Sequence, residues 1–143
     1  MHTTDRISYV SNWISNYAIK SSKDPFNLVV GISGGIDSAV TSALCAKTNL
    51  KTIVVSMPIK QDEYQHSLSL EHIEWLQSNF SNVKSYVINL DNVFKIFQDN
   101  MKNFSSDLAF ANSRSRLRMV TLYQIAQSNN SLVVGTGNKV EDF

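Results

Sequence analysis

The chain has 143 residues, of which 43% are hydrophobic and 17% charged, so it is long and apolar enough to bury the core of one globular domain rather than to act as a tail or linker. Its formal net charge of +1 gives no general attraction to nucleic acid or to an anionic membrane, and no apolar run approaches the ~20 residues that span a bilayer. The single cysteine, Cys45, cannot form an internal disulfide and the N-terminus lacks the layout of a secretory signal, so we expect a cytoplasmic protein.

Apolar residues at helical spacing predict a first helix that is capped by Thr4 or Asp5 and ends in the polar segment 21–25. A continuous apolar run then predicts a buried strand over residues 28–32, followed by a helix over 37–47. The same patterns predict three further strands, over 52–57, 85–90 and 132–134. They also predict three further helices, over 68–80, 91–101 and 108–127, and Asp91 is the expected cap of the second of these.

Strands that alternate with helices in this way predict an α/β fold with a doubly wound parallel sheet. In such folds, ligands bind in the crevice beyond the carboxyl ends of the strands. The segments that follow the first and last strands are therefore the places to look for a site.

The most informative segment joins the first strand to the next helix and reads Gly31-Ile32-Ser33-Gly34-Gly35-Ile36-Asp37-Ser38. Amide groups of a turn and of a first helical turn have no intrahelical partners, and with the helix macrodipole they favour an anion close to the main chain. Two adjacent glycines would allow that approach. We call residues 33–38 the 33–38 loop and predict that it binds phosphate.

Asp37 lies within this loop, although a phosphate group would repel its carboxylate. A cation such as Mg²⁺ that bridges the carboxylate and the phosphate oxygens would resolve the conflict. The sequence therefore predicts a metal and nucleotide site.

The 33–38 loop differs from the commoner phosphate-binding patterns. It has no Lys before its Ser, as a Walker A loop requires, and its glycines do not have the spacing of a dinucleotide fingerprint. It resembles the Ser-Gly-Gly-x-Asp-Ser loop of the ATP pyrophosphatase (PP-loop) superfamily, whose members cleave ATP to AMP and pyrophosphate. The alternative is an ordinary strand, turn and helix whose glycines serve tight packing.

A second loop, residues 135–141, follows the last predicted strand. If strands 28–32 and 132–134 are neighbours at the topological switch point, both loops face one crevice. Thr136 can then donate its hydroxyl to a phosphate or ribose oxygen, and Glu141 can supply a hard oxygen ligand opposite Asp37. The alternative for Glu141 is an exposed charge.

Arg114, Arg116 and Arg118 form the third candidate group. On a helix, Arg114 and Arg118 share a face while Arg116 points nearly the opposite way, so all three cannot reach one ligand unless the helix begins later. Spacing alone leaves open whether they bind a ligand, pair with carboxylates or line a solvated face.

Together, the 33–38 loop, residues 112–119 and residues 135–141, in this order, resemble ammonia-dependent NAD⁺ synthetase over essentially the whole chain. The resemblance implies an adenine nucleotide alpha hydrolase-like fold and a single ATP-binding domain over residues 1–143. It implies ATP binding by residues 31–38, Thr136 and Gln61, Mg²⁺ binding by Asp37 and Glu141, and deamido-NAD⁺ binding by Arg116 and Asn112.

The implied reaction has two steps. The nicotinate carboxylate of deamido-NAD⁺ attacks the α-phosphorus of ATP and pyrophosphate leaves; ammonia then attacks the activated carbonyl, which releases AMP and gives NAD⁺. Members of the family are homodimers, so the resemblance also implies a homodimer. Cys45, on an apolar helix, is expected to be a buried thiol without a catalytic role.

The chain departs from the family at its end, since it stops at residues 140–143, just after the last predicted strand, where family members continue. We therefore expect a truncated form with an unpaired sheet edge that is prone to association. Two alternatives are a nucleotide-binding module without turnover and another PP-loop adenylating enzyme of the GMP synthetase type. Substrate-dependent pyrophosphate release would separate them.

Overall fold

Strands and helices alternate along the chain in the predicted order. The structure is a computed structural model that describes residues 2–21, 26–60 and 63–137. Its strands are β1 (Asn27–Gly31), β2 (Thr52–Ser56), β3 (Val83–Val87) and β4 (Ser131–Val133). Its helices are α1 (Thr3–Lys20), α2 (Ile36–Ala46), α3 (Glu63–Asn79), α4 (Asp91–Asn100) and α5 (Asp107–Ser128).

The described strands form one parallel sheet in the order β3-β2-β1-β4. The chain builds the sheet outward from β1 through β2 to β3 and then returns to place β4 on the other side of β1. In the β1–β4 pair, Asn27 is opposite Ser131 and Val29 is opposite Val133. The switch point therefore lies between β1 and β4, which is the condition under which the two loops can face one crevice, and the predicted doubly wound α/β fold is confirmed.

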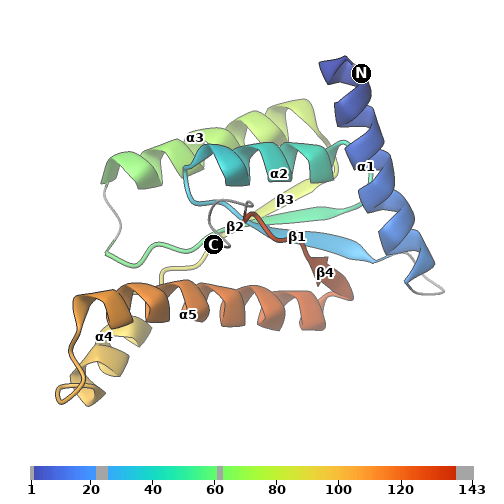
Figure 1. Cartoon of the computed structure of the whole chain (residues 1–143). Helices are drawn as coiled ribbons and strands as arrows, with labels where there is room; N and C mark the ends of the chain where they lie inside the picture. The colour runs from blue at the N-terminus through green and yellow to red at the C-terminus, as the bar shows by residue number, and fades with distance from the viewer. Residues whose placement is uncertain (1, 22–25, 61–62, 138–143) are drawn as a thin grey trace.

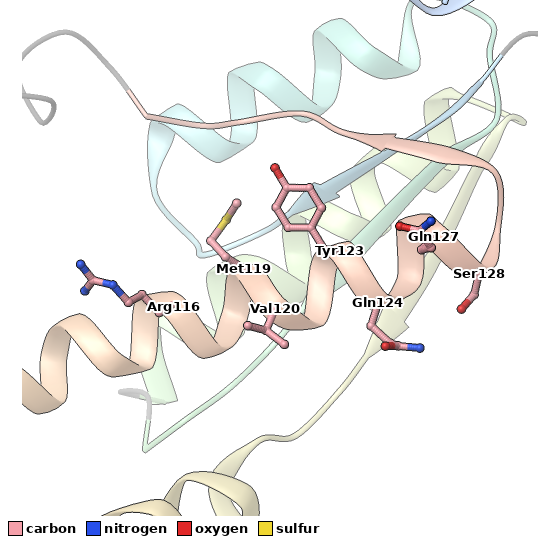
Figure 2. A pocket seen from close by; sticks show the side chains of 7 residues that line it. All are labelled: Arg116, Met119, Val120, Tyr123, Gln124, Gln127 and Ser128. Atoms are coloured by element: carbon pink, nitrogen blue, oxygen red, sulfur yellow. The ribbon is translucent and has the colours of Figure 1, made fainter. Parts of the chain in front are cut away.

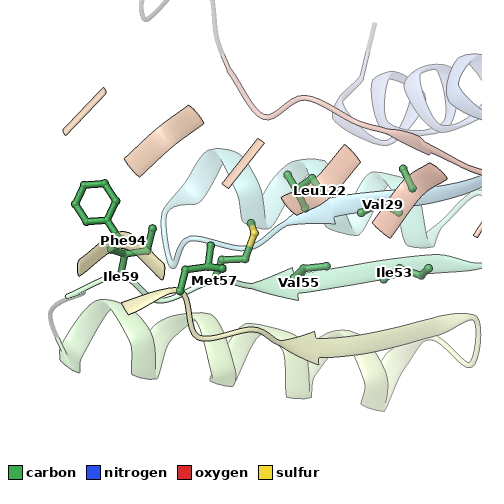
Figure 3. Packing of buried hydrophobic residues seen from close by; sticks show 9 residues of the cluster. Val29, Ile53, Val55, Met57, Ile59, Phe94 and Leu122 are labelled. Carbon is green, nitrogen blue, oxygen red and sulfur yellow. The ribbon is translucent and has the colours of Figure 1, made fainter. Parts of the chain in front are cut away.

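Helices cover both faces of the sheet, with α1, α2 and α3 on one side and α4 and α5 on the other (Figure 1). Alternate strand residues point to opposite faces, as a pleated strand requires. The face toward α4 and α5 carries a buried cluster that includes Val29, Ile53, Val55, Phe94 and Leu122 (Figure 3).

The opposite face contains two smaller clusters. One joins Val54 to Ile73 and Leu76 of α3, and the other joins Leu28 and Val30 to Ala18 and Cys45. Full burial of a Val, Leu or Ile side chain contributes about 1.5–3 kcal/mol relative to exposure. Because β1 and β2 are buried from both sides, they form a rigid support for the loops at their carboxyl ends.

Two predicted helix caps are wrong. Helix α1 begins at Thr3 with His2 as its N-cap, so neither Thr4 nor Asp5 caps it. Asp91 is the first residue of α4 and Leu90 is the N-cap. The Asp91 carboxylate instead accepts a hydrogen bond from the Lys60 amide, because tertiary structure brings the loop after β2 to the start of α4.

The third strand is also displaced from its expected position. It spans Val83–Val87 rather than 85–90, because its register is set by pairing with β2, where Val83 is opposite Thr52 and Val87 is opposite Ser56. None of the described helices is long and apolar enough to cross a membrane.

Candidate functional site

Ser38 organises the 33–38 loop at the carboxyl end of β1. It is 3% exposed, and its hydroxyl oxygen accepts a hydrogen bond from the Ser33 amide at 3.1 Å while the hydroxyl donates to the Gly35 carbonyl at 3.2 Å. The Ser33 hydroxyl oxygen in turn accepts from the Gly35 amide at 3.2 Å. These bonds fix the turn before any ligand is bound.

Gly34 has a φ of +91°, in the left-handed region that favours glycine. A Cβ atom at this position would lie 2.5 Å from the backbone oxygen of Gln65 on α3. At Gly35, by contrast, an added Cβ would make only an ordinary contact of 3.4 Å with the Ser33 hydroxyl oxygen. The structure therefore requires glycine at position 34 because the loop packs closely against α3.

The hydrogen bonds within the 33–38 loop determine which amide groups remain for an anion. The amides of Ser33 and Gly35 donate to hydroxyl oxygens, whereas those of Gly34 and Ile36 donate to no acceptor in the described part of the chain. They lie at the N-terminus of α2, where the macrodipole favours negative charge. Asp37 lies in the same first turn.

A cavity of about 510 Å³ opens beside this loop, between the carboxyl ends of the strands and α5. It is lined by Gly31, Ile32, Ser33, Gly35, Met57, Gln65, Ser115, Arg118, Met119, Leu122 and Thr136. The loop after β1 and Thr136 after β4 thus contribute to one cavity. Gly34 and Ile36 line a separate groove of about 450 Å³ between α2 and α3.

The three arginines of α5 have three different surroundings. The Arg114 guanidinium lies 5.5 Å from the centre of the Phe94 ring, and the Arg118 Nε donates to the Met57 carbonyl at 3.0 Å. Arg116 Nη1 donates to the carbonyl of Asn112, one turn earlier, at 3.4 Å. Since α5 begins at Asp107, all three arginines are helical and cannot converge on one ligand, as their spacing predicted.

Arg116 lines a shallow hollow of about 690 Å³ along the outer side of α5, together with Met119, Val120, Tyr123, Gln124, Gln127 and Ser128. Figure 2 shows that all seven lining side chains come from this one helix. Met119 also lines the cavity beside the 33–38 loop, so the two spaces are adjacent. Arg116 and Thr136 therefore line neighbouring spaces rather than the same one.

Two of the predicted site residues, Gln61 and Glu141, lie outside the described residues. Among the described residues, no three His, Cys, Asp or Glu side chains cluster in a way that could hold a metal ion. Cys45 is fully buried, and this burial raises the pKa of its thiol to about 12, so the thiol stays protonated near neutral pH.

Several residues that line the cavity were not assigned to the site from the sequence, among them Arg118, Met57 and Gln65. Met57 and Gln65 carry no sequence signal, because their position depends on how β2 and α3 pack. Arg118 belongs to the arginine group that the sequence singled out. Its spacing from Arg116 placed it on a different face of the helix but could not show that this face lines the cavity.

A family model described as NAD synthase matches residues 6–143. The NH(3)-dependent NAD(+) synthetase of Carboxydothermus hydrogenoformans is 35% identical over 138 residues, which cover 91% of this chain and 53% of that protein. The chain therefore spans about half the length of this relative.

Solved structures agree with the sequence comparison. The NMN synthetase of Francisella tularensis superposes with a TM-score of 0.86 and 31% identity, over 96% of this chain and 56% of that one. The NH3-dependent NAD synthetase of Campylobacter jejuni gives a TM-score of 0.84 and 26% identity, over 99% and 59%. In both, the similar region is a little over half of the solved chain.

Proposed function

Because this chain belongs to the NAD synthase family, we propose that it is the ATP-binding domain of an ammonia-dependent NAD⁺ synthetase. The proposed reaction joins ammonia to the nicotinate carboxylate of deamido-NAD⁺ and converts ATP to AMP and pyrophosphate. The observation that carries the proposal is that the 33–38 loop and Thr136, from the two strands at the switch point, line one cavity.

The 33–38 loop would act on the phosphate groups of ATP. In the first step, negative charge develops on phosphate oxygens as the substrate carboxylate attacks the α-phosphorus and pyrophosphate leaves. Amide groups that are fixed before the reaction stabilise such charge at no cost of reorganisation, and the Ser38 hydrogen bonds supply that rigidity. We propose that the hydroxyl of Thr136 donates to the same nucleotide.

The chemistry of Asp37 fits a magnesium ion. Carboxylate oxygens are hard donors, and Mg²⁺ in nucleotide sites is held by one or two carboxylates together with phosphate oxygens. We propose Asp37 and Glu141 as the protein ligands. When bound, the ion would offset the negative charge of the phosphate groups.

We propose that Arg116 and Asn112 bind deamido-NAD⁺. The Asn112 carbonyl accepts from Arg116 Nη1, which holds the guanidinium along the outer surface of α5. The hollow beside Arg116 adjoins the ATP cavity through Met119, so a dinucleotide in the hollow could extend toward the α-phosphorus. Gln61 is proposed to approach the adenylate, and a homodimer is the proposed assembly.

A second candidate substrate comes from the similarity to the Francisella tularensis NMN synthetase, whose name specifies a mononucleotide product. That similarity favours testing the deamidated mononucleotide beside deamido-NAD⁺. The same adenylation and ammonia attack would apply, because both substrates present the same nicotinate carboxylate.

The proposal is tested by measuring pyrophosphate release and amide product from ATP, Mg²⁺ and ammonium with each of the two substrates. We expect NAD⁺ from deamido-NAD⁺, and a loss of rate of more than about 100-fold in Asp37→Ala, since outer-shell partners of a metal already contribute 10–100-fold. Asp99→Ala, which changes an exposed carboxylate on α4, is the matched control and should keep the wild-type rate.

Amide product from the mononucleotide alone would assign the second substrate. ATP binding that depends on Asp37 without any product would identify a nucleotide-binding module. Pyrophosphate release only with another acid would indicate a different adenylating enzyme, of the GMP synthetase type. The absence of ATP binding would overturn the proposed function.

A further inference from the structure

Arg118 projects from α5 into the same cavity that the 33–38 loop lines. Its Nε donates to the Met57 carbonyl, just beyond β2, at 3.0 Å. A guanidinium has five N–H donors in a rigid plane, and this bond uses only the one on Nε. The contact therefore fixes the plane of the group and leaves four donors on its two terminal nitrogens.

The charge of Arg118 has no protein counterion within the described ranges 2–21, 26–60 and 63–137, since its one hydrogen bond there goes to the neutral Met57 carbonyl. The side chain is half-buried, and burial lowers the pKa of its guanidinium, with a smaller lowering effect from the charge of Arg114. A cation that is desolvated and placed near a like charge is stabilised by an anion.

Other residues that line the cavity give it the same preference for an anion. They include Ser33 and Gly35 of the 33–38 loop, at the positive end of the α2 macrodipole, and Thr136. An anionic group in this cavity would lie between helix α2 and the guanidinium on α5. Arginine suits phosphate at such a position, because two of its parallel N–H groups can bind two oxygens.

We propose that Arg118 is a phosphate-binding residue that contacts the nucleotide from the side opposite the 33–38 loop. The inference rests on the proposed function in that the phosphate is taken to belong to ATP. The competing role for Arg118 is structural: its Nε would serve only to satisfy the Met57 carbonyl at the end of β2.

The test compares Arg118→Gln with the matched control Arg114→Gln, which changes an arginine on the same helix that lies over the Phe94 ring. Glutamine keeps an N–H donor for the Met57 carbonyl but carries no charge. Calorimetric titrations of the whole chain would use ATP with Mg²⁺, inorganic pyrophosphate and adenosine as probes. We expect Arg118→Gln to weaken ATP and pyrophosphate binding at least about 10-fold and to leave adenosine binding unchanged. Arg114→Gln should bind all three like the wild type.

Several outcomes would overturn the inference. ATP affinity that is unchanged in Arg118→Gln would do so, as would an equal loss for adenosine and ATP, which is the result of a structural role. If Arg118→Gln does not fold, side-chain NMR of the wild-type chain replaces it. Pyrophosphate should then shift the Arg118 guanidinium signal, and a signal that stays in place would reject the contact.

The same titrations separate this inference from the proposed function. If pyrophosphate binding depends on Arg118 but no amide product forms, the phosphate contact stands and the synthetase assignment fails. If the wild-type chain makes product while Arg118→Gln binds ATP normally, the synthetase stands and the contact fails. A wild-type chain that binds neither ATP nor pyrophosphate overturns both.

Discussion

Gly34 shows how a single residue can couple the candidate site to the packing of a helix. Its positive φ and its proximity to the Gln65 carbonyl leave no space for a side chain. The sequence predicted that the two glycines give a phosphate group access to the main chain. At position 34 the structure gives a different physical reason, because the space that a Cβ would fill is already taken by the backbone of α3.

We predict that Gly34→Ala lowers the free energy of unfolding by more than about 2 kcal/mol, since alanine would be strained at this φ and would displace α3. Gly35→Ala should change it by less than about 0.5 kcal/mol, because the N-cap φ of −87° suits any residue. Urea denaturation followed by circular dichroism measures both. Equal effects of the two substitutions would contradict the explanation.

His72 links α3 to α2 through a hydrogen bond of 2.8 Å between its Nε2 and the Ser42 hydroxyl oxygen. The Ser42 hydroxyl also bonds to the Ala39 carbonyl, at 3.0 Å. Burial lowers the pKa of His72 below its ordinary value of 6.5, while a hydrogen bond to the Ala39 backbone acts in the opposite direction. The folded chain therefore favours the neutral imidazole.

A histidine whose pKa is lower in the folded state stabilises the fold above its unfolded pKa of 6.5, and this contribution is lost as the pH falls through the folded pKa. We predict that the free energy of unfolding decreases as the pH falls from 7 to 5. In His72→Gln, the free energy of unfolding should change less with pH over this range. Denaturation at several pH values measures it. The exposed His2 provides the control His2→Gln, and an equal change of slope in both variants would show that His72 is not responsible.

At the scale of helices and strands, much of the fold could be predicted because local patterns agree with tertiary structure. The apolar run before the 33–38 loop identified β1, which is buried on both faces, and the alternation of strands with helices identified the parallel sheet. Helix α5 was expected from about 108 and begins at Asp107, where Ser106 accepts a hydrogen bond from the Ala109 amide.

The elements that were misplaced are those whose limits depend on distant partners. Strand β3 follows the register of β2 rather than its own hydrophobic run, and Ile88 beyond its end packs into the α4 and α5 cluster. Asp91 has a typical cap residue type, but its carboxylate is bonded to Lys60. For the same reason, the sequence could indicate the 33–38 loop as a site but not that Arg118 and Gln65 line the cavity.

At the scale of the molecule, apolar side chains remain exposed on the outer side of α5. Val120 is 65% exposed and Tyr123 is 59% exposed, although Leu122 and Ala126 on the inner side of the same helix are buried. A helix with apolar side chains on two opposite sides typically packs against other protein on both of those sides. We therefore expect the outer side of α5 to form the interface of the proposed homodimer, so that the hollow proposed for deamido-NAD⁺ would lie at this interface.

We predict that Val120→Glu shifts the chain toward the monomer in analytical ultracentrifugation, because burial of an unpaired carboxylate at an interface is costly. Val40→Glu on α2 is the matched control, since Val40 is 50% exposed and lies on the other side of the sheet. The control should sediment like the wild type. A wild-type chain that is monomeric at all concentrations would refute the expected interface.

The position of β4 beside β1 also determines when the candidate site can form during folding. The side chain of Asn27, at the start of β1, bonds to the carbonyl of Asn129, 102 positions later in the chain, and β4 follows directly. The pairing of β1 with β2 closes a much shorter loop, and contacts between distant segments form slowly because the entropy of closure must be lost first. During synthesis, β1, α2 and β2 can assemble while the ribosome is still making α5. The crevice that joins the 33–38 loop to Thr136 therefore forms later than the part of the sheet made by β1 and β2.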